Sequence, residues 1–285
     1  MSTLKIAIQK KGRLSQKSLE LLKSCGIEIP NGTASLTAKA KNFPLEILYL
    51  RDDDIPQYVE QQVADLGILG QNEVLEKQRD VTQIEALGFS NCRLSLAIPK
   101  SQSYSGITDL SNKRIATSYP NILKKYLAKQ NVTASIEQIG GSVEIAPSIG
   151  LADGVCDIVS SGSTLLTNGL KEVEVILKSE AVLIANKQLS QDKQQLLDRL
   201  LFRLRAVKSA EQNKYILLNA PNTSIEKISA ILPGMKSPTV MPLAQEGWSS
   251  MHSVVNENAF WEVIDQLKNA GAQGILVVPI QKMIA

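Results

Sequence analysis

A short apolar run that ends in small hydroxyl and glycine residues most constrains this chain. The run, Val155–Val159, predicts a buried strand that carries one acidic residue, Asp157. Ser160-Ser161-Gly162-Ser163-Thr164 follows at once, and Leu165 and Leu166 then suit the first turn of a helix. In such a unit, backbone N–H groups, hydroxyls and the positive end of the helix dipole can converge on one anion. The stretch predicts a receptor for ribose 5-phosphate, with Asp157 accepting hydrogen bonds from sugar hydroxyls; an ordinary turn with a Ser or Thr N-cap explains the pattern equally well.

Two basic segments also follow predicted strands. Leu4–Ile8 alternates as a strand does and leads into Lys11-Gly12-Arg13-Leu14, before a helix whose N-cap we predict at Ser15. Leu45–Leu50 is a second predicted strand and ends at Arg51. Because ligands of open α/β sheets bind beyond the carboxyl ends of the strands, these cations favour a polyphosphate ligand. A solvated basic turn is the alternative for the first segment.

Composition excludes several classes of function. The formal net charge of +3 is small and scattered over 285 residues, so it does not indicate a nucleic-acid partner. No run approaches the roughly 18 apolar residues of a membrane span, and the start shows no apolar core of a signal peptide. We therefore expect a cytoplasmic protein that binds neither nucleic acid nor membrane.

The numbers and positions of cysteine and histidine limit which kinds of metal site, disulfide and catalytic triad the chain can form. Cys25, Cys92 and Cys156 are odd in number, distant in sequence and set in apolar surroundings, which favours reduced thiols in the core over disulfides or a metal site. His252 is the single histidine. A zinc site rich in histidine and a Ser-His-Asp triad are both disfavoured.

The order of predicted elements divides the chain into three parts. Strands alternate with helices in residues 1–93 and again in residues 94–180, and residues 181–207 return toward the first part. Two crossings between these parts are typical of a hinged, two-lobed α/β protein. Residues 208–285 predict the order βαββαβ of a ferredoxin-like α+β domain. We predict one lobe in residues 1–93 with 181–207, a second in 94–180, and a smaller domain in 208–285.

Some boundaries rest on local signals. Ser118 is the predicted N-cap of a helix with Pro120 in its first turn. Thr223 and Glu226 have the spacing of a capping box. Val173–Ala185 is predicted as a single strand that returns to the first lobe.

Five segments, in this order and spacing, resemble those of one known family. They are Lys11-Gly12-Arg13-Leu14, Arg51-Asp52-Asp53-Asp54-Ile55-Pro56, Arg114-Ile115-Ala116-Thr117-Ser118-Tyr119-Pro120-Asn121, Gly140-Gly141-Ser142-Val143-Glu144-Ile145-Ala146-Pro147 and the loop after Asp157. Together they make the chain resemble the long form of ATP phosphoribosyltransferase, the first enzyme of histidine biosynthesis. The resemblance covers essentially the whole chain. It implies a periplasmic-binding-protein-like catalytic part and an ACT-like regulatory domain.

The resemblance also implies a reaction. Adenine N1 of ATP would attack C1 of 5-phosphoribosyl 1-pyrophosphate (PRPP), which releases pyrophosphate. Because charge develops at the anomeric carbon and on the leaving group, positioning and electrostatics suffice, and no covalent nucleophile is expected. Mg²⁺ carried by the polyphosphates is the implied cofactor, and Glu144 is implied to hold either ribose or magnesium, so a metal cage built by the protein alone is not required.

Site residues follow from the resemblance, position by position. It implies a PRPP site at Glu144, Asp157, Ser160, Ser161, Gly162, Ser163, Thr164 and Leu165. It implies contacts to ATP or pyrophosphate at Lys11, Gly12, Arg13, Leu14, Arg51, Thr117, Ser118 and Tyr119. Many family members carry an aspartate near Asn72, so the amide of this chain argues against a charged role there.

The last domain is implied to bind histidine as an inhibitor. Asn219, Ser237 and Thr239 match effector positions of related long-form enzymes, although polar residues on a strand surface are an equal alternative. His252 is expected to be structural or to lie at the edge of this pocket. The resemblance further implies a homo-oligomer that assembles from dimers to hexamers.

Two other functions are also compatible with the predicted architecture and the loop after Asp157. A non-catalytic binding protein would share the two-lobed architecture, because fold does not imply function. Another phosphoribosyltransferase would use the same loop with a different nucleophile. Neither rival accounts for the segments outside the loop or for the added C-terminal domain.

Overall fold

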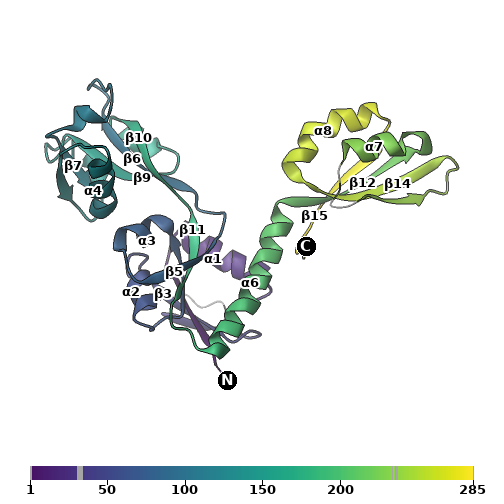
Figure 1. The fold of residues 1–285 in the computed structure, drawn as a ribbon, viewed down its shortest axis with the longest axis horizontal. Coiled ribbons are helices and arrows are strands. Elements are labelled where there is room, and N and C mark those ends of the chain that lie inside the picture. The colour runs from purple at the N-terminus through teal and green to yellow at the C-terminus, as the bar shows by residue number, and fades with distance from the viewer. Residues whose placement is uncertain (1, 31–34, 233, 235–236, 285) are drawn as a thin grey trace. The chain divides into compact units, whose positions relative to one another are not determined.

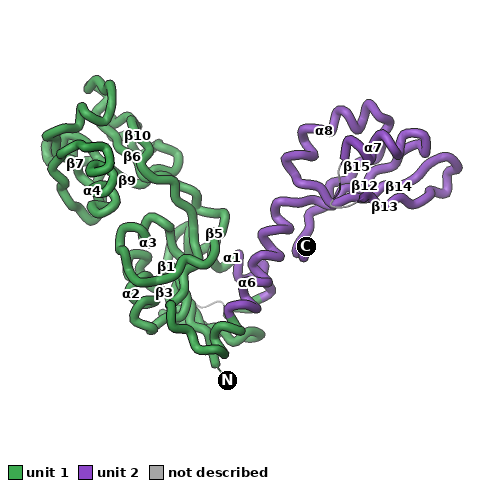
Figure 2. The backbone as a smooth tube through the Cα atoms, viewed as in Figure 1, with its two compact units in different colours: residues 1–20, 27–196 green, residues 21–26, 197–285 purple. Residues whose placement is uncertain are grey.

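The computed structural model describes residues 2–30, 35–232, 234 and 237–284. Figure 2 shows the two compact units of the chain, residues 1–20 with 27–196 and residues 21–26 with 197–285. The first unit contains two β-sheets, each with its own helices, which we call lobe I and lobe II. Among the described residues, no helix has both the length and the apolar character needed to cross a membrane.

Lobe I is a six-stranded sheet in the order β2-β3-β1-β4-β11-β5. Its strands are β1 (Leu4–Gln9), β2 (Thr37–Lys39), β3 (Leu45–Leu50), β4 (Leu66–Gly70), β5 (Val81–Ala86) and β11 (Ala181–Asn186), and its helices are α1 (Arg13–Ser24), α2 (Ile55–Glu60) and α3 (Gln71–Lys77). Strands β1, β3 and β4 run parallel, whereas β2, β5 and β11 join antiparallel. Strand β4 is buried on both faces and apolar throughout, whereas β1 and β3 carry the exposed Lys5 and the half-buried Glu46.

Gly67 of β4 lets helix α2 approach this sheet closely. A Cβ at Gly67 would lie 2.6 Å from Ile55 Cγ2 and 3.1 Å from Ile184 Cγ1. Ile55, Val59 and Ile184 are fully buried around it. The missing side chain therefore permits the packing that fixes α2 beyond the end of β3.

Lobe II is a five-stranded sheet in the order β10-β6-β9-β7-β8. Its strands are β6 (Cys92–Pro99), β7 (Arg114–Thr117), β8 (Ser135–Gln138), β9 (Gly154–Val159) and β10 (Leu170–Ser179), and its helices are η1 (Ile107–Leu110), α4 (Pro120–Lys129), η2 (Val143–Ile145) and α5 (Ser163–Thr167). Successive side chains of each strand point to opposite faces of the sheet, and a separate hydrophobic core covers each face. Leu96 and Cys156 face α4, whereas Val155 and Val159 pack against Val143 of η2 and Leu165 of α5.

The chain passes between the lobes twice. The first passage lies between β5 and β6, and the second is a single residue, Glu180, between β10 and β11. The predicted single strand Val173–Ala185 is therefore wrong, because β10 pairs with β6 in lobe II and β11 pairs with β4 and β5 in lobe I.

Three predicted helix caps are also wrong. Ser15 lies inside α1, which starts at Arg13. The hydroxyl of Ser118 donates to the carbonyl of Ile139 instead of capping α4, and α7 starts at Ile225 without a side-chain cap. At α4 a tertiary contact replaces the predicted cap, whereas α1 and α7 begin at residues other than those that the local spacing predicted.

The second unit contains an antiparallel sheet in the order β13-β14-β12-β15. Its elements are the last part of α6 (Gln191–Glu211), β12 (Asn213–Pro221), η3 (Asn222–Ser224), α7 (Ile225–Ile231), β13 (Thr239–Pro242), β14 (Trp248–Asn256), α8 (Glu257–Asn269) and β15 (Gln273–Pro279). This is the predicted βαββαβ order, with the ferredoxin-like strand arrangement. Figure 1 shows α7 and α8 on one side of the sheet, where Ile216, Met251 and Phe260 form the core.

Candidate functional site

Basic residues gather at the carboxyl edge of the lobe I sheet. Gln9 at the end of β1 lies opposite Leu50 at the end of β3, so the loops that follow the two strands are neighbours. Lys11, Arg13 and Arg51 are exposed on these loops. The Arg51 side chain is 80% exposed, and its Nε lies 3.1 Å from Asp53 Oδ1. An ion pair this exposed contributes little to stability, which leaves Arg51 available to an anionic ligand.

The carboxyl edge of the lobe II sheet gathers the other predicted segments. Strands β7, β8 and β9 are parallel, and Thr117 at the end of β7 lies opposite both Gln138 of β8 and Cys156 of β9. The segment after β8 contains Glu144 in η2, and the loop after β9 starts at Ser160. Three segments that are distant in sequence therefore meet at one edge.

The loop after β9 is compact and has exposed hydroxyls. Gly162 has φ +82°, a left-handed conformation that glycine adopts without strain. The Oγ atoms of Ser161 and Ser163 are 3.0 Å apart, and Ser160 and Thr164 are also exposed. Leu165 is 5% exposed and anchors α5 in the core. The hydroxyls thus face solvent from a loop that is fixed at its far end.

Asp157 and Glu144 form an acidic pair beside this loop. Asp157 is partly buried on β9, and its Oδ1 accepts a hydrogen bond of 2.8 Å from the backbone N–H of Ile158. Burial raises the pKa of Asp157, and the negative charge of Glu144 raises it further. Two nearby carboxylates suit sugar hydroxyls or a hard cation such as Mg²⁺. No cluster of three or more His, Cys, Asp or Glu residues arranged for a metal occurs within the described part of the chain.

The start of α4 is already bonded to lobe I, which the sequence did not reveal. Both carboxylate oxygens of Glu76, a residue of α3, accept hydrogen bonds of 3.0 Å from the backbone N–H groups of Asn121 and Ile122. The side-chain amide of Asn121 also donates to the carbonyl of Glu76 at 3.1 Å. Glu76 is 5% exposed, so this is a buried cap supplied across the two lobes. These N–H groups of α4 are therefore engaged in this structure.

The three site residues before α4 are engaged as well. The backbone N–H of Tyr119 donates to Thr117 Oγ1 at 2.9 Å, and Ser118 Oγ donates to the carbonyl of Ile139 at 2.7 Å. Burial and the charge of Glu73 raise the pKa of Tyr119. In this conformation the polar atoms of this segment hold lobe II together and link it to lobe I.

Asn72 uses its amide in a way that a carboxylate could not. Its Nδ2 donates to Tyr119 Oη and to Glu73 Oε1, each at 3.2 Å, and its Oδ1 accepts a bond of 2.9 Å from Ser179 Oγ. Asn72 and Glu73 are each 7% exposed, and burial raises the pKa of Glu73. The amide thus links α3, α4 and the end of β10 through both donor and acceptor atoms.

We expect Asn72→Asp to lower the free energy of unfolding by about 1–2 kcal/mol at neutral pH, because it replaces buried donors with a second carboxylate beside Glu73. A carboxyl whose pKa is higher in the folded state than in the unfolded state favours folding only while protonated. The deficit should therefore be small near about pH 4.5 and larger near about pH 8. Urea unfolding at both pH values measures it, with the exposed Asn112→Asp as control. A loss independent of pH would contradict this explanation.

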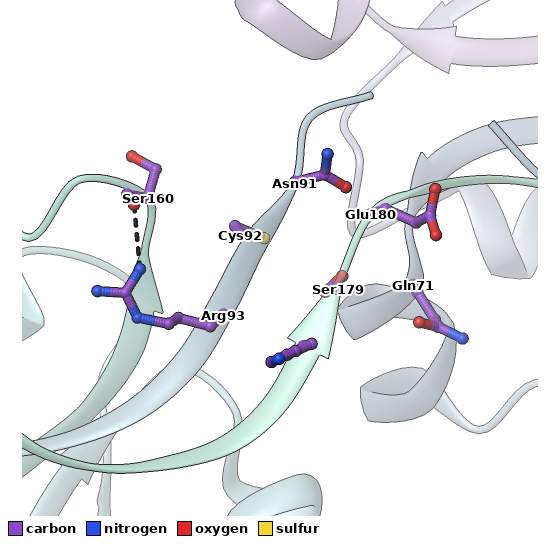
Figure 3. A pocket seen from close by; sticks show the side chains of 8 residues that line it. Gln71, Asn91, Cys92, Arg93, Ser160, Ser179 and Glu180 are labelled. Atoms are coloured by element: carbon purple, nitrogen blue, oxygen red, sulfur yellow. Dashed lines mark hydrogen bonds between the residues drawn. The ribbon is translucent and has the colours of Figure 1, made fainter. Parts of the chain in front are cut away.

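A hollow of about 490 Å³ lies where the chain crosses between the lobes. Figure 3 shows the residues around it, with Arg93 and Ser160 on the lobe II side and Gln71 on the lobe I side. Its lining is formed by Gln71, Asn91, Cys92, Arg93, Ser160, Lys178, Ser179 and Glu180. Of this set, only Ser160 is a site residue predicted from the sequence.

The predicted effector residues lie on the open face of the C-terminal sheet or beside it. Thr239 of β13 lies opposite His252, and Asn219 of β12 lies opposite Ser250. The Nδ1 and Nε2 atoms of His252 lie 3.0 Å from Tyr215 Oη and Ser250 Oγ respectively. Ser237 is exposed just before β13. Polar groups thus form a row on the face away from α7 and α8.

Comparison with known proteins decides the family. A family model described as ATP phosphoribosyltransferase matches residues 51–206, and one described as its C-terminal domain matches residues 210–282. The curated ATP phosphoribosyltransferase of Cytophaga hutchinsonii is 58% identical over 285 residues, which is 100% of both chains. The chain belongs to the ATP phosphoribosyltransferase family. Its counterpart in Bacteroides thetaiotaomicron is 57% identical over 281 residues, 99% of each chain.

Solved structures support the same fold. A chain of the ATP phosphoribosyl transferase (HisG:HisZ) complex from Thermotoga maritima aligns with a TM-score of 0.62 and 30% identity, and covers 71% of this chain and 97% of its own. A probable amino-acid ABC transporter extracellular-binding protein from Bacillus subtilis aligns with a TM-score of 0.50 and 14% identity, over 73% of this chain and 93% of its own. The second likeness concerns the fold alone. The predicted periplasmic-binding-protein-like lobes and C-terminal ferredoxin-like domain are confirmed.

Family membership also answers the question of function class. Members are pentosyltransferases that carry out the first step of histidine biosynthesis, so the prediction of an enzyme is confirmed. The rival interpretation as a binding protein without turnover is wrong.

Proposed function

We propose that the chain transfers the 5-phosphoribosyl group of PRPP to N1 of the adenine of ATP, which gives N1-(5-phosphoribosyl)-ATP and pyrophosphate. The observation that carries the proposal is the meeting, at the carboxyl edge of the lobe II sheet, of the hydroxyl loop after β9 with the carboxylates of Asp157 and Glu144. Together they offer donors for a phosphate and acceptors for sugar hydroxyls. The basic loops of lobe I offer the charge that two polyphosphates need.

Each proposed role matches the chemistry of its residues. The loop Ser160–Leu165 binds the 5-phosphate, Asp157 binds the ribose hydroxyls, and Glu144 binds ribose or the magnesium of the substrate. Lys11, Gly12, Arg13, Leu14 and Arg51 bind pyrophosphate or the phosphates of ATP. Thr117, Ser118 and Tyr119 lie near the nucleotide, and because their N–H and hydroxyl groups are engaged in this structure, a polar contact from them to the nucleotide requires an exchange of these bonds. The two catalytic lobes are then lobe I and lobe II, for which we predicted residues 1–93 with 181–207 and residues 94–180; β6 of lobe II already begins at Cys92, so that boundary lies two residues earlier. Residues 208–285 form the proposed regulatory domain.

The mechanism needs no covalent nucleophile from the protein. Breaking the bond from C1 to the pyrophosphate oxygen gives the ribosyl group positive character, while the bond electrons pass to the leaving group. The Asp157 carboxylate lies on the side of the ribosyl group, where its charge stabilises that positive character and orients the hydroxyls. The cationic side chains of lobe I hold both polyphosphates so that N1 reaches C1. Mg²⁺, when bound with the substrates, supplies charge that offsets the leaving pyrophosphate.

Pyrophosphate release tests the proposal directly. The purified chain is incubated with ATP, PRPP and Mg²⁺, and absorbance follows the N1-substituted adenine. Release that requires both substrates supports the reaction. Release with a free purine base in place of ATP, or none with ATP, would reject the proposed nucleophile.

We further propose that the C-terminal domain binds histidine as a feedback inhibitor. Asn219 and Thr239 share the open face of its sheet, and Ser237 lies beside them, so their polar groups are available to an amino acid. The same face carries exposed apolar residues, including Leu276 at 58% and Val278 at 40% exposure. Such a face fits assembly of identical subunits, which we propose proceeds from dimers to hexamers; analytical ultracentrifugation with and without histidine measures it.

We expect Thr239→Ala to weaken inhibition by histidine about tenfold, the effect of losing roughly one good hydrogen bond to a charged ligand. Turnover without histidine should stay unchanged, because Thr239 lies outside the catalytic unit. Histidine titrations of initial rate measure both quantities. Thr223→Ala, at an exposed position of the same domain, is the matched control. Equal inhibition of the Thr239 variant and the parent would remove Thr239 from the effector site.

A further inference from the structure

An arginine at the start of β6, beside the passage between the lobes, is held in one orientation by a carboxylate. Arg93 of β6 and Glu172 of β10 form a two-pronged pair, in which Nε to Oε1 and Nη2 to Oε2 are both 2.5 Å. The Glu172 side chain also accepts a bond of 2.7 Å from Ser95 Oγ, and Ser95 is 1% exposed. Hydrogen bonding to Arg93 holds the pKa of Glu172 below its usual range. The two parallel hydrogen bonds hold the guanidinium of Arg93, and the bond from Ser95 holds the carboxylate of Glu172, so neither group has much freedom to rotate.

The remaining arm of this guanidinium reaches the proposed phosphate loop. Arg93 Nη1 donates to the backbone carbonyl of Ser160 at 3.2 Å, the contact drawn in Figure 3. Ser160 is the first residue after β9 and opens the loop. Glu172 neutralises the charge of Arg93 and fixes its orientation. Arg93 therefore acts on the Ser160 carbonyl as a fixed hydrogen-bond donor rather than as a free cation.

Strand register places this network beside the acidic residue of the site. Across the antiparallel pair of β6 and β9, Arg93 lies opposite Val159 and Ser95 lies opposite Asp157. Side chains opposite each other in such a pair share a face of the sheet. Arg93, Ser95 and Asp157 therefore share the face that η2 and α5 also cover.

We propose that Arg93, held by Glu172, is a positioning residue that fixes the backbone of the loop Ser160–Leu165 and thereby sets the affinity for PRPP. This inference rests on the proposed function of that loop. The loop contains Gly162 in a left-handed conformation and exposed hydroxyls, so its shape needs an external anchor. An anchored loop loses less conformational entropy when it binds phosphate, which appears as tighter binding.

The test compares three variants of the full chain, Arg93→Met, Arg93→Lys and Glu172→Gln. PRPP affinity is measured by calorimetry with Mg²⁺ and without ATP, and KM for each substrate is measured by pyrophosphate release. We expect Arg93→Met to raise the Kd and the KM for PRPP about tenfold while KM for ATP changes less than about threefold, since the anchor holds only the proposed phosphate loop. Arg93→Lys keeps the charge without the fork and should restore only part of the affinity.

Glu172→Gln should raise the Kd for PRPP by a smaller factor than Arg93→Met, since it loosens the fork without removing it. In the double variant, Glu172→Gln should add little to Arg93→Met, because the two residues act through one contact. Arg114→Met is the matched control, since Arg114 also forms an ion pair with an acid, 3.7 Å from Asp153. Arg114 lies at the amino end of β7, away from the carboxyl edge where the proposed site lies. This variant should leave the affinity for PRPP unchanged.

Variants of the loop residues distinguish failure of the proposed positioning role of Arg93 from failure of the proposed PRPP site. If Thr164→Val and Asp157→Asn weaken PRPP binding but neither Arg93 variant does, the positioning role is wrong and the proposed function stands. If all of them leave the Kd for PRPP unchanged, the proposed site itself is wrong. Equal losses of PRPP and ATP affinity in Arg93→Met would indicate damage to the whole lobe and would overturn the proposal. If Arg93→Met does not fold, Arg93→Lys and Glu172→Gln give the same decision.

Discussion

Asp157→Asn is expected to lower kcat/KM for PRPP by about a hundredfold while the protein remains folded. Hydrogen bonds to a charged group contribute roughly 1.5–3 kcal/mol each, and each 1.4 kcal/mol corresponds to about a factor of ten. Loss of the charge from two bonds to ribose hydroxyls therefore accounts for the size of the effect. Because burial already disfavours the charged form of Asp157, its neutral replacement should not weaken the fold.

Steady-state kinetics with varied PRPP, together with thermal unfolding, measure both parts of this expectation. Glu137→Gln removes a carboxylate from β8 of the same sheet, outside the proposed site, and serves as the control. A fall in melting temperature that matches the loss of activity would show a structural role for Asp157 instead. A change in KM for ATP alone would assign it to the other substrate.

The pH dependence of the parent enzyme provides a second measure of Asp157. Its raised pKa means that the carboxylate is lost at a higher pH than for an ordinary aspartate, which titrates near about 3.9. As the pH falls through the raised value, kcat/KM for PRPP should fall with it. This acid limb should be absent from Asp157→Asn.

Glu76→Ala is expected to lower the free energy of unfolding of the first compact unit, which contains lobes I and II, by about 2–4 kcal/mol. The N–H groups of Asn121 and Ile122 are only partly buried, so loss of their partner costs each of them about 1 kcal/mol, the low end of the usual range. Loss of the negative charge at the α4 N-terminus adds up to about 2 kcal/mol. For a unit of this size, each kcal/mol shifts the melting temperature by about 2–4 °C, so we expect a fall of roughly 5–15 °C. Differential scanning calorimetry measures it.

Glu76→Gln retains one acceptor oxygen and should give a smaller loss than the alanine variant. Glu20→Ala, an exposed glutamate on α1, should melt as the parent does. If Glu76→Ala also melts as the parent does, water replaces the carboxylate at no cost and the two lobes do not depend on this contact.

Features carried by neighbouring residues were predictable from the sequence. Val155–Val159 followed by hydroxyl residues predicted β9, its loop and the start of α5, and the structure has all three. The βαββαβ order of the last domain was predictable for the same reason, because alternation and helical spacing are local properties. The resemblance to a family further predicted which strands contribute the loops at their carboxyl ends to a single site.

Contacts between distant residues were not predictable in this way. Glu76 lies 45 positions before Asn121, and Arg93 lies 79 positions before Glu172. Nothing near either acid indicates its partner, since the pairing exists only once both sheets have formed. The N-cap predicted at Ser118 failed for this reason, because Glu76 bonds the N–H groups of α4 while Ser118 bonds Ile139.

The one-residue passage at Glu180, where the chain crosses between lobe I and lobe II, is hydrogen-bonded through both its backbone and its side chain. Its carbonyl accepts a bond of 2.9 Å from the N–H of Gln71, and its Oε2 accepts one of 2.7 Å from the N–H of Gly88. Gln71 belongs to lobe I, whereas Gly88 belongs to the other passage, residues 87–91, so Glu180 bonds its own passage both to lobe I and to the other passage. Leu87 N–H also donates to the carbonyl of Ala181 at 2.8 Å, and Ala181 N–H donates to the carbonyl of Phe89 at 2.9 Å. The two passages are thus bonded to each other along their length, so any displacement of lobe II that keeps these bonds has to carry both passages together.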